Sequence, residues 1–360
     1  MVYNEIRAPK REVKIGRVTI GEGNKIAIQS MTNTKTEDRE ATLRQVGALE
    51  EAGCDIIRVS VPSAEAARTI GYLKEKGIAT PLVADIHYDH RLAILAAERG
   101  ADKIRINPGN IGGEEALREV CRACRARGIP IRIGVNSGSL EREILNKYGA
   151  PSAGALCESA LRNIALLERF DFFDIVVSIK SSDVKTMIDA NVLLFERSAY
   201  PLHLGVTEAG AGRIGLVKSA VGIGALLCRG IGDTIRISLT DDPLNEVSAA
   251  RELLTALGIE GQRGLNIISC PTCSRTSVDL IRLHREFEAA ARREGLLDKP
   301  LTVALMGCAV NGPGEAREAD IGVAGGVGEA LLFKRGRIVG KVKEEEIINT
   351  LIKEIKDITK

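Results

Sequence analysis

The sequence lacks the features that would place it in a membrane, secreted or nucleic-acid-binding class. Its 360 residues include 50 basic and 48 acidic ones, so no global field draws the chain to nucleic acid or to an acidic membrane. No apolar run is long enough to span a bilayer. The first segment, Met1–Val18, is charged and has no apolar signal-peptide core. No segment of low complexity interrupts the chain.

The eight cysteines, with no secretion signal, indicate a reducing cytoplasm in which they are ligands or core residues rather than disulfides. Cys270 and Cys273 are separated by Pro-Thr, and 34 residues lie between Cys273 and Cys308. Cys308 stands in the Gly/Pro-rich run Gly307–Glu315. Three thiolates suit a [4Fe–4S] cluster with one chemically open iron. A structural zinc site would want a fourth Cys or a His, and the nearby His284 lies in a helical pattern.

Eight short β-branched runs recur before residue 240, and most are followed by a helical pattern. The runs are Ile26–Met31, Ile56–Val61, Leu82–Ile86, Lys103–Asn107, Ile131–Asn136, Asp174–Lys180, Pro201–Val206 and Thr234–Leu239. The clearest helices are Glu37–Glu51 with Thr36 as N-cap, Ala64–Lys76, Arg91–Arg99 and Glu114–Arg127. This alternation predicts an α/β fold whose N-terminal domain is a (β/α)8 TIM barrel. A doubly wound sheet would need strands that are apolar on both faces.

Polar residues fall at alternate positions of these runs, so they share one face of each strand. The apolar face of a barrel strand meets the helices, and the polar face therefore lines the interior. The inward residues are Arg58, Ser60, Asp85, His87, Arg105, Asn107, Arg132, Asn136, Ser178, Lys180, His203, Arg236 and Ser238. Five are cations and the only inward acid on these strands is Asp85, so an external anion such as a diphosphate is expected. Structural ion pairs are the alternative.

A cluster of glycines within Leu257–Arg263 marks a domain boundary, which predicts domains of residues 1–258 and 259–360. The second is expected to be a small α+β domain that holds the cluster. Its predicted elements are strands Leu265–Ser269, Leu301–Met306 and Asp320–Ala324, a hairpin Leu331–Val342 turning at Arg335-Gly336, a helix Val278–Glu294 and a last helix from Lys343. Cys270 and Cys308 each follow a strand, so one sheet edge can hold both loops.

Other motifs have structural interpretations. Gly210–Gly215 spells G-x-G-x-x-G but follows a seventh strand rather than a first one, so we interpret it as a barrel loop and not a dinucleotide site. Cys121 and Cys124 lie on the apolar stripe of a helix. The remaining cysteines are expected to be small buried residues; they are Cys54, Cys157 and Cys228.

The cysteine motif and several others resemble one family closely. The other motifs are Gln29–Thr34, Arg58–Pro62, Val83–His87, Arg105–Asn110 and Thr207–Gly210. The chain is similar over nearly its whole length to the 4-hydroxy-3-methylbut-2-enyl diphosphate synthase family, the iron–sulfur oxidoreductases of the methylerythritol phosphate route to isoprenoids. It resembles the shorter bacterial form with two domains.

The resemblance implies a reaction and a set of site residues. The reaction is reductive ring opening and dehydroxylation of 2-C-methyl-D-erythritol 2,4-cyclodiphosphate, with two electrons from flavodoxin or ferredoxin passing through the cluster. The implied cluster ligands are Cys270, Cys273, Cys308 and Glu315, with Asn311 near the open iron. The implied substrate residues are Arg58, Asp85, His87, Arg105, Asn107, Arg132, Asn136, Lys180, His203, Arg236 and Ser238. Glu208, which follows the seventh strand at the barrel mouth, is our candidate proton donor.

Two alternatives remain. An electron-transfer or sensor protein could carry the cluster, although it would not need five inward cations. A barrel enzyme that acts on another phosphorylated substrate could carry a structural metal domain instead.

The topology also predicts a homodimer whose active sites are shared between chains. In a (β/α)8 barrel the catalytic mouth lies at the C-terminal ends of the strands, whereas the eighth helix, Asn245–Leu257, returns the chain to the opposite end. The tether Gly258–Gly264 reaches at most roughly 25 Å. The cluster would therefore cap the mouth of a second barrel in a head-to-tail dimer, and the family resemblance points the same way.

Overall fold

The computed structural model describes residues 7, 9–262, 264–310 and 312–359, with Pro313 and Glu315 described through their backbone only. The chain divides into two compact units, Met1–Glu260 and Gly261–Lys360. This division falls two residues beyond the predicted one. Within the described residues, no helix combines the length and apolar character needed to cross a membrane.

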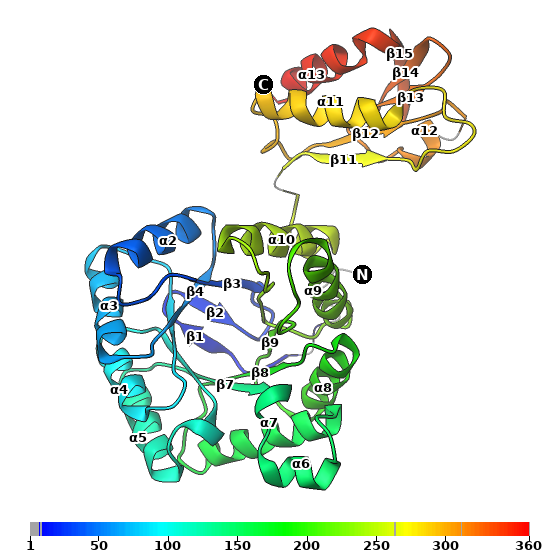
Figure 1. Ribbon diagram of the computed structural model, residues 1–360. Helices are drawn as coiled ribbons and strands as arrows, with labels where there is room; N and C mark the ends of the chain where they lie inside the picture. The colour runs from blue at the N-terminus through cyan, green and yellow to red at the C-terminus, as the bar shows by residue number, and fades with distance from the viewer. Residues whose placement is uncertain (1–6, 8, 263, 311, 360) are drawn as a thin grey trace. The chain divides into compact units, whose positions relative to one another are not determined.

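The first unit is a closed barrel of eight parallel strands, so the predicted fold is confirmed (Figure 1). The strands are β3 (Ala27–Met31), β4 (Ile56–Ser60), β5 (Leu82–Asp85), β6 (Lys103–Ile106), β7 (Ile131–Asn136), β8 (Ile175–Lys180), β9 (His203–Leu204) and β10 (Thr234–Ile235). They pair in sequence order from β3 to β8, and β10 pairs with both β3 and β9. A parallel bridge between Val177 and Leu202 joins β8 to β9 and closes the ring. Each strand lies within its predicted run.

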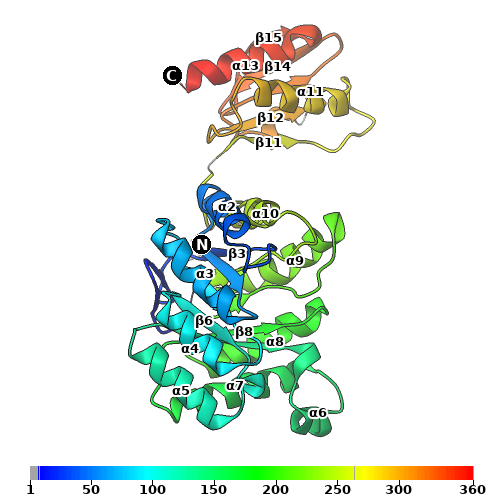
Figure 2. The same cartoon turned by 60° about the vertical axis from the view of Figure 1, so that its left-hand side comes forward.

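Helices surround the barrel (Figures 1 and 2). They are α2 (Arg39–Glu51), α3 (Ala64–Glu75), α4 (His90–Glu98), α5 (Glu114–Arg125), α6 (Arg142–Tyr148), α7 (Ala153–Glu168), α8 (Val184–Arg197), α9 (Gly212–Leu227) and α10 (Pro243–Ala256). The predicted cap of the first helix is wrong. The carboxylate of Asp38, rather than Thr36, accepts the N–H of Ala41, because the helix begins two residues later than predicted and Asp38 is then adjacent to its free N–H groups.

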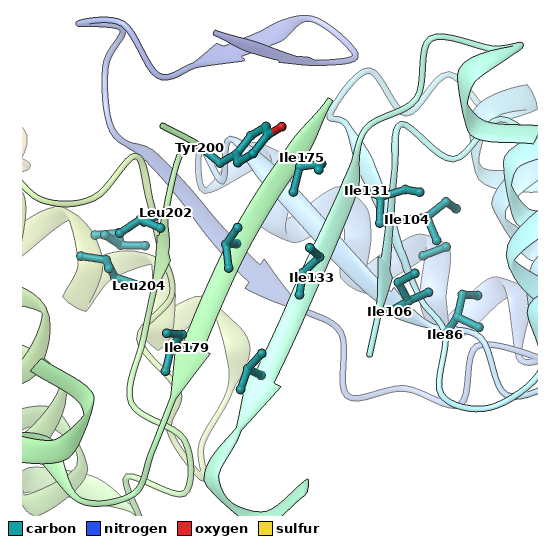
Figure 3. Packing of buried hydrophobic residues seen from close by; sticks show 14 of the residues in the cluster. Ile86, Ile104, Ile106, Ile131, Ile133, Ile175, Ile179, Tyr200, Leu202 and Leu204 are labelled. Carbon is teal, nitrogen blue, oxygen red and sulfur yellow. The ribbon is translucent and has the colours of Figure 1, made fainter. Parts of the chain in front are cut away.

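The apolar faces of the strands pack outward against these helices. Figure 3 shows isoleucines of neighbouring strands side by side in this layer, including Ile104, Ile131 and Ile175. All three are fully buried. The β-branched residues occupy the outer face of each strand, and the polar residues occupy the inner face.

A β-hairpin that the sequence analysis did not predict underlies the barrel. Its strands are β1 (Val13–Ile15) and β2 (Val18–Ile20). Val13, Ile15 and Ile20 are buried in one cluster with inward residues of the barrel. Those barrel residues are Ala27, Ile56, Val83 and Val176. The hairpin therefore seals the end of the barrel where the strands begin.

The second unit is a five-stranded sheet with strand order β11-β12-β13-β14-β15, the last two pairings being antiparallel. The strands are β11 (Asn266–Ser269), β12 (Thr302–Met306), β13 (Ile321–Gly325), β14 (Glu329–Lys334) and β15 (Arg337–Lys343). The helices are α11 (Leu280–Arg293), the short α12 (Gly312–Glu315) and α13 (Ile347–Ile358). Arg335 and Gly336 both have positive φ, as a two-residue hairpin turn requires. The predicted α+β architecture is confirmed.

Candidate active site and cysteine loops

The inward side chains of the barrel form layers, each built by four residues from alternate strands. The strand register places Gln29, Val83, Arg132 and His203 at one level. The layer nearer the mouth holds Arg58, Arg105, Ser178 and Arg236, and the layer nearer the floor holds Ile56, Lys103, Val176 and Thr234. A barrel without a site would fill these layers with aliphatic residues. Cations occupy all three layers here.

Asp85 pairs with two arginines of the layer nearer the mouth, Arg58 and Arg105. Its carboxylate lies 3.2 Å from Arg58 Nη2 and 3.1 Å from Arg105 Nη1, and 3.4 Å from Nε2 of the exposed His87. Burial would raise the pKa of Asp85, but the charge of Arg58, the hydrogen bond from His87 and the charge of Arg105 together hold it well below its usual value. The group is therefore a permanent anion that orients two guanidinium groups.

Arg236 has a partner that the sequence analysis missed. Glu246, on α10, faces its Nε and Nη2 at 3.2 Å each and is almost fully buried. The same carboxylate accepts the hydroxyl hydrogen of Ser30 at 2.8 Å. Asp85 is thus not the only acid that serves these cations. Glu246 is part of a helical pattern, and no strand periodicity could have placed it in the barrel.

Arg132 and Lys180 have no ion-pair partner in the described part of the chain. Arg132 is 1% exposed, and its Nε and Nη1 make no hydrogen bond there. Burial, followed by the charges of neighbouring cations, lowers the pKa of both groups well below their usual values. Two inward glycines leave space for the layer: a Cβ at Gly134 would lie 2.6 Å from Arg105 Nε, and one at Gly205 would lie 2.9 Å from Lys180 Nζ.

The floor of the barrel holds a sixth inward cation that was also missed. Lys103 is fully buried, and its Nζ has no partner among the described residues. His203 Nδ1 lies 2.8 Å from Thr234 Oγ1, while its Nε2 is buried and unpartnered in the described structure. Burial and nearby cations lower the pKa of His203 well below its usual value, so the ring is neutral. The signal was present in the sequence, because Lys103 begins the run Lys103–Asn107 and alternation places it on the same face as Arg105 and Asn107.

Replacing Lys103 by methionine should stabilise the protein at neutral pH. Burial lowers the pKa of this amine well below the 10.5 of an exposed lysine, so the folded state binds fewer protons than the unfolded state. Wild-type stability should therefore rise with pH up to about that value. We expect Lys103→Met to raise the free energy of unfolding by roughly 1–3 kcal/mol at pH 7, with a smaller gain at pH 9.5, in urea titrations. Lys14→Met, on the exposed side of β1, is the control. A gain that does not change with pH would contradict the assignment.

The remaining predicted residues surround the mouth at the C-terminal ends of the strands. Asn107 follows β6, where its side chain accepts the N–H of Gly109 at 3.2 Å. Ser178 donates to the carbonyl of Ile133 at 3.2 Å, and Ser238 follows β10 half-buried. Asn136 and Glu208 line one cavity of about 470 Å³. Glu208 has φ of 51°, an uncommon conformation for a residue other than glycine.

The cysteine loops meet at one end of the second sheet. β11 and β12 are parallel neighbours with Ser269 opposite Leu305, so Cys270 and Gly307-Cys308 emerge together. The N–H of Gly307 donates to Cys270 Sγ at 3.2 Å. Hydrogen bonds from the backbone and side chain of Arg275 lower the pKa of the exposed Cys273.

The donor set of these loops fits a cluster held by three thiolates. Among the described residues, no three His, Cys, Asp or Glu side chains are gathered closely enough to hold a metal ion. The three thiols thus share one end of the sheet without forming a closed ligand set. Asn311 lies outside the described residues. Glu315 is the last residue of α12, and only its backbone is described.

The other cysteines follow the predictions with one exception. Cys121 and Cys124 are buried on one face of α5, and Cys54 and Cys157 are buried as well. Cys228 is exposed, so the prediction that it is buried is wrong; it follows directly after α9, at the helix end. The segment Gly210–Gly215 was predicted to be a barrel loop; only Gly210 and Ala211 belong to the loop after β9, and Gly212–Gly215 form the first turn of α9.

Two family models cover most of the chain. The GcpE TIM-barrel domain matches residues 10–251, and the GcpE protein C-terminal domain matches residues 266–357. Among solved structures, the type I 3-dehydroquinate dehydratase of Clostridium difficile has a TM-score of 0.52 at 15% identity, covering 70% of this chain and 98% of that one. That likeness concerns the fold alone.

Curated relatives match over the full length. A protein of Caldanaerobacter subterraneus subsp. tengcongensis is 56% identical over 99% of both chains. One of Geobacillus kaustophilus is 54% identical over 97% of this chain and 92% of its own. Both are named 4-hydroxy-3-methylbut-2-en-1-yl diphosphate synthase (flavodoxin). With a barrel and a C-terminal domain that each match their family model, the chain belongs to the GcpE family of oxidoreductases.

Proposed function

We propose that this enzyme binds 2-C-methyl-D-erythritol 2,4-cyclodiphosphate in its barrel and reduces it to 4-hydroxy-3-methylbut-2-enyl diphosphate. Two electrons enter through a [4Fe–4S] cluster held by Cys270, Cys273 and Cys308, with Glu315 as a weaker ligand to the fourth iron. With protons from solvent, the two electrons open the ring and release one hydroxyl as water. The product is the compound that the relatives' name states.

The observation that carries the proposal is the imbalance of charge inside the barrel. In the described part of the barrel, six inward cations face two buried carboxylates, those of Asp85 and Glu246. Unpaired cations in a low-dielectric interior are costly. A diphosphate that arrives at the mouth would offset that cost, because its oxygens accept the free N–H groups of Arg58, Arg105 and Arg132.

Other residues would orient the substrate. Asp85 holds the guanidinium groups of Arg58 and Arg105, so that their free edges turn to the ligand. His87 and Lys180 would add donors at the rim, as would Arg236. The polar side chains around the mouth would hold the carbon skeleton, with the buried His203 below them; those at the mouth are Asn107, Asn136, Ser178 and Ser238.

A residue at the mouth of the barrel, Glu208, would donate the proton. Glu208 lies there on a loop after β9 and is exposed, so it can exchange protons with solvent. When bound, the cluster supplies single electrons and a Lewis acid for the leaving oxygen. Asn311, which precedes α12, is proposed to lie near that oxygen.

Anaerobic turnover tests the function directly. Purified protein with reconstituted cluster, the cyclodiphosphate and dithionite should form 4-hydroxy-3-methylbut-2-enyl diphosphate, detected by mass spectrometry. Protein without iron should form none. Zinc in place of iron in the metal analysis, or iron-loaded protein that leaves the cyclodiphosphate unchanged, would refute the proposal and favour a barrel enzyme with a structural metal domain.

We further propose that the active site is shared by two chains in a head-to-tail homodimer. Near the end of α10, Arg251 donates to the carbonyl of Gly53 at 2.9 Å, in the loop that enters β4. The chain therefore leaves the barrel near the end where its strands begin, opposite the mouth. A tether of about seven residues spans at most roughly 25 Å, so the cluster of one chain would cap the barrel of another.

Complementation tests the shared site. Cys270→Ser lacks a sound cluster and Arg132→Met lacks a sound barrel, so each homodimer should be inactive or nearly so. After subunit exchange, a mixed dimer holds one site with both parts intact, and activity should return to about half the wild-type value per mixed dimer. Native mass spectrometry verifies the exchange. Mixed dimers that form without any recovery would refute a site shared between chains.

A further inference from the structure

The two faces of the second sheet carry different elements. Alternate residues of β12 point to opposite sides: Val303 and Leu305 pack with α11 and α13, whereas Ala304 and Met306 face the segment that contains α12. A Cβ at Gly312, the first residue of α12, would lie 2.8 Å from the Met306 side chain. Figure 1 shows α11 and α13 together over one face. The helix that bears Glu315 thus lies on the face opposite α11.

Cys270 lies where these two faces meet. It packs against the apolar clusters of both faces and is half-buried. On the α11 side it borders a cavity of about 390 Å³. The cavity is lined by Ser269, Cys270, Pro271, Thr272, Leu280, Ile281, His284 and Arg285. One proposed cluster ligand is therefore reached from the α11 face, away from α12.

The surroundings of this cavity combine exposed apolar area with positive charge. Ile281 is 56% exposed. Arg285 is exposed, and neither it nor His284 has an ion-pair partner among the described residues. The described lining contains no acidic residue. The next residue of α11, Glu286, is exposed but lines the cavity on the other flank of the helix, and Glu288 is paired with Arg292 at 3.4 Å. By contrast, the cavity on the other flank of α11 mixes Arg282 and Lys343 with several glutamates.

We propose that the patch formed by Ile281, His284 and Arg285 is the docking surface for an acidic electron-carrier protein, the flavodoxin of the proposed function. A small apolar centre with an unpaired basic rim is the counterpart of an acidic protein surface. The contact would be small and short-lived, as suits a carrier that must leave after each electron. Two carriers dock in turn, each is oxidised by one electron, and the substrate receives both.

This assignment places electron entry and substrate binding on opposite faces of the second sheet. Electrons enter beside Cys270 on the α11 face, while the substrate approaches Glu315 on the α12 face. A carrier can then dock while the opposite face covers a barrel. The inference rests on the proposed function, because it takes the cluster to lie between these faces.

Charge reversal at Arg285 tests the surface in the iron-loaded enzyme. Arg285→Glu should raise the KM for reduced flavodoxin about tenfold and flatten the dependence of kcat/KM on salt. Turnover with dithionite, which needs no docking, should stay unchanged. Binding of oxidised flavodoxin, measured by NMR line broadening of the carrier, should weaken by a similar factor. This second readout does not depend on turnover.

Arg293→Glu is the matched control. It reverses one exposed charge on the same helix, about 12 Å further along its axis, and should change the KM for flavodoxin less than twofold. Equal effects of the two variants, or no effect of Arg285→Glu on carrier binding, would overturn the docking surface. If the wild-type enzyme showed no turnover with dithionite, the proposed function would be refuted instead. The docking surface could still be tested, because the binding of flavodoxin is measured without turnover.

Discussion

Replacing Cys308 by serine is expected to abolish turnover and to release most of the bound iron. Two thiolates cannot hold a four-iron core, and the loop that carries Cys308 packs against the Cys270 thiol through the N–H of Gly307. The measurements are iron per chain and the visible absorption of anaerobically purified protein. Wild-type iron content in the variant would remove Cys308 from the ligand set.

Two companion variants distinguish loss of the cluster from loss of the fold. Glu315→Ala should keep more iron than Cys308→Ser while losing most activity, because three thiolates remain. Cys228→Ser should keep both iron and activity, since this exposed cysteine lies in the barrel unit. Equal iron loss in Glu315→Ala and Cys308→Ser would mean that the carboxylate is as necessary as the thiol.

Replacing Arg132 by methionine is expected to have opposite effects on substrate binding and on stability. Loss of one charge-assisted phosphate contact should weaken binding by roughly 1.5–3 kcal/mol, without changing the cluster spectrum. Because the buried guanidinium has no carboxylate partner in the described chain, the same change should raise the Tm of the substrate-free protein. Substrate should then raise the Tm of the variant less than that of wild type.

Isothermal titration with the cyclodiphosphate and thermal unfolding check the two parts separately. Arg91→Met is the control, because this arginine is exposed and pairs only with Asp89 among the described residues. An unchanged Kd would take Arg132 out of the pocket. A lower Tm in the absence of substrate would show that the guanidinium contributes to folding rather than being held there for a ligand.

The positions of the strands and of the inward polar residues could be predicted because both depend on short-range periodicity. Side chains alternate along a strand, so Arg105 and Asn107 were assigned to the interior from their spacing alone. The positions of the cysteines at strand ends could be predicted for the same reason, because Cys270 and Cys308 each come after a β-branched run. Two parallel neighbouring strands end at the same edge of a sheet, so the two loops lie together.

The pairing of charges could not be predicted in this way. Glu246 reaches Arg236 because α10 packs beside β3, and the helical pattern of Pro243–Ala256 contains no sign of it. Likewise, the β1–β2 hairpin closes the floor through contacts with four strands, and β8 is far from the hairpin in sequence. Such contacts depend on closure of the barrel, which brings together residues more than 200 positions apart.

The sequence by itself therefore determined the barrel, the polar lining and the cysteine loops, since each is encoded by a local pattern of side chains. Only the tertiary structure decided which cations are paired: within the described residues Arg132 and Lys103 have no acid partner, whereas Arg58 and Arg105 share Asp85. It also decided that α11 and α12 lie on opposite faces of their sheet. The reason is that burial and charge balance depend on distances in space, which the order of residues along the chain does not contain.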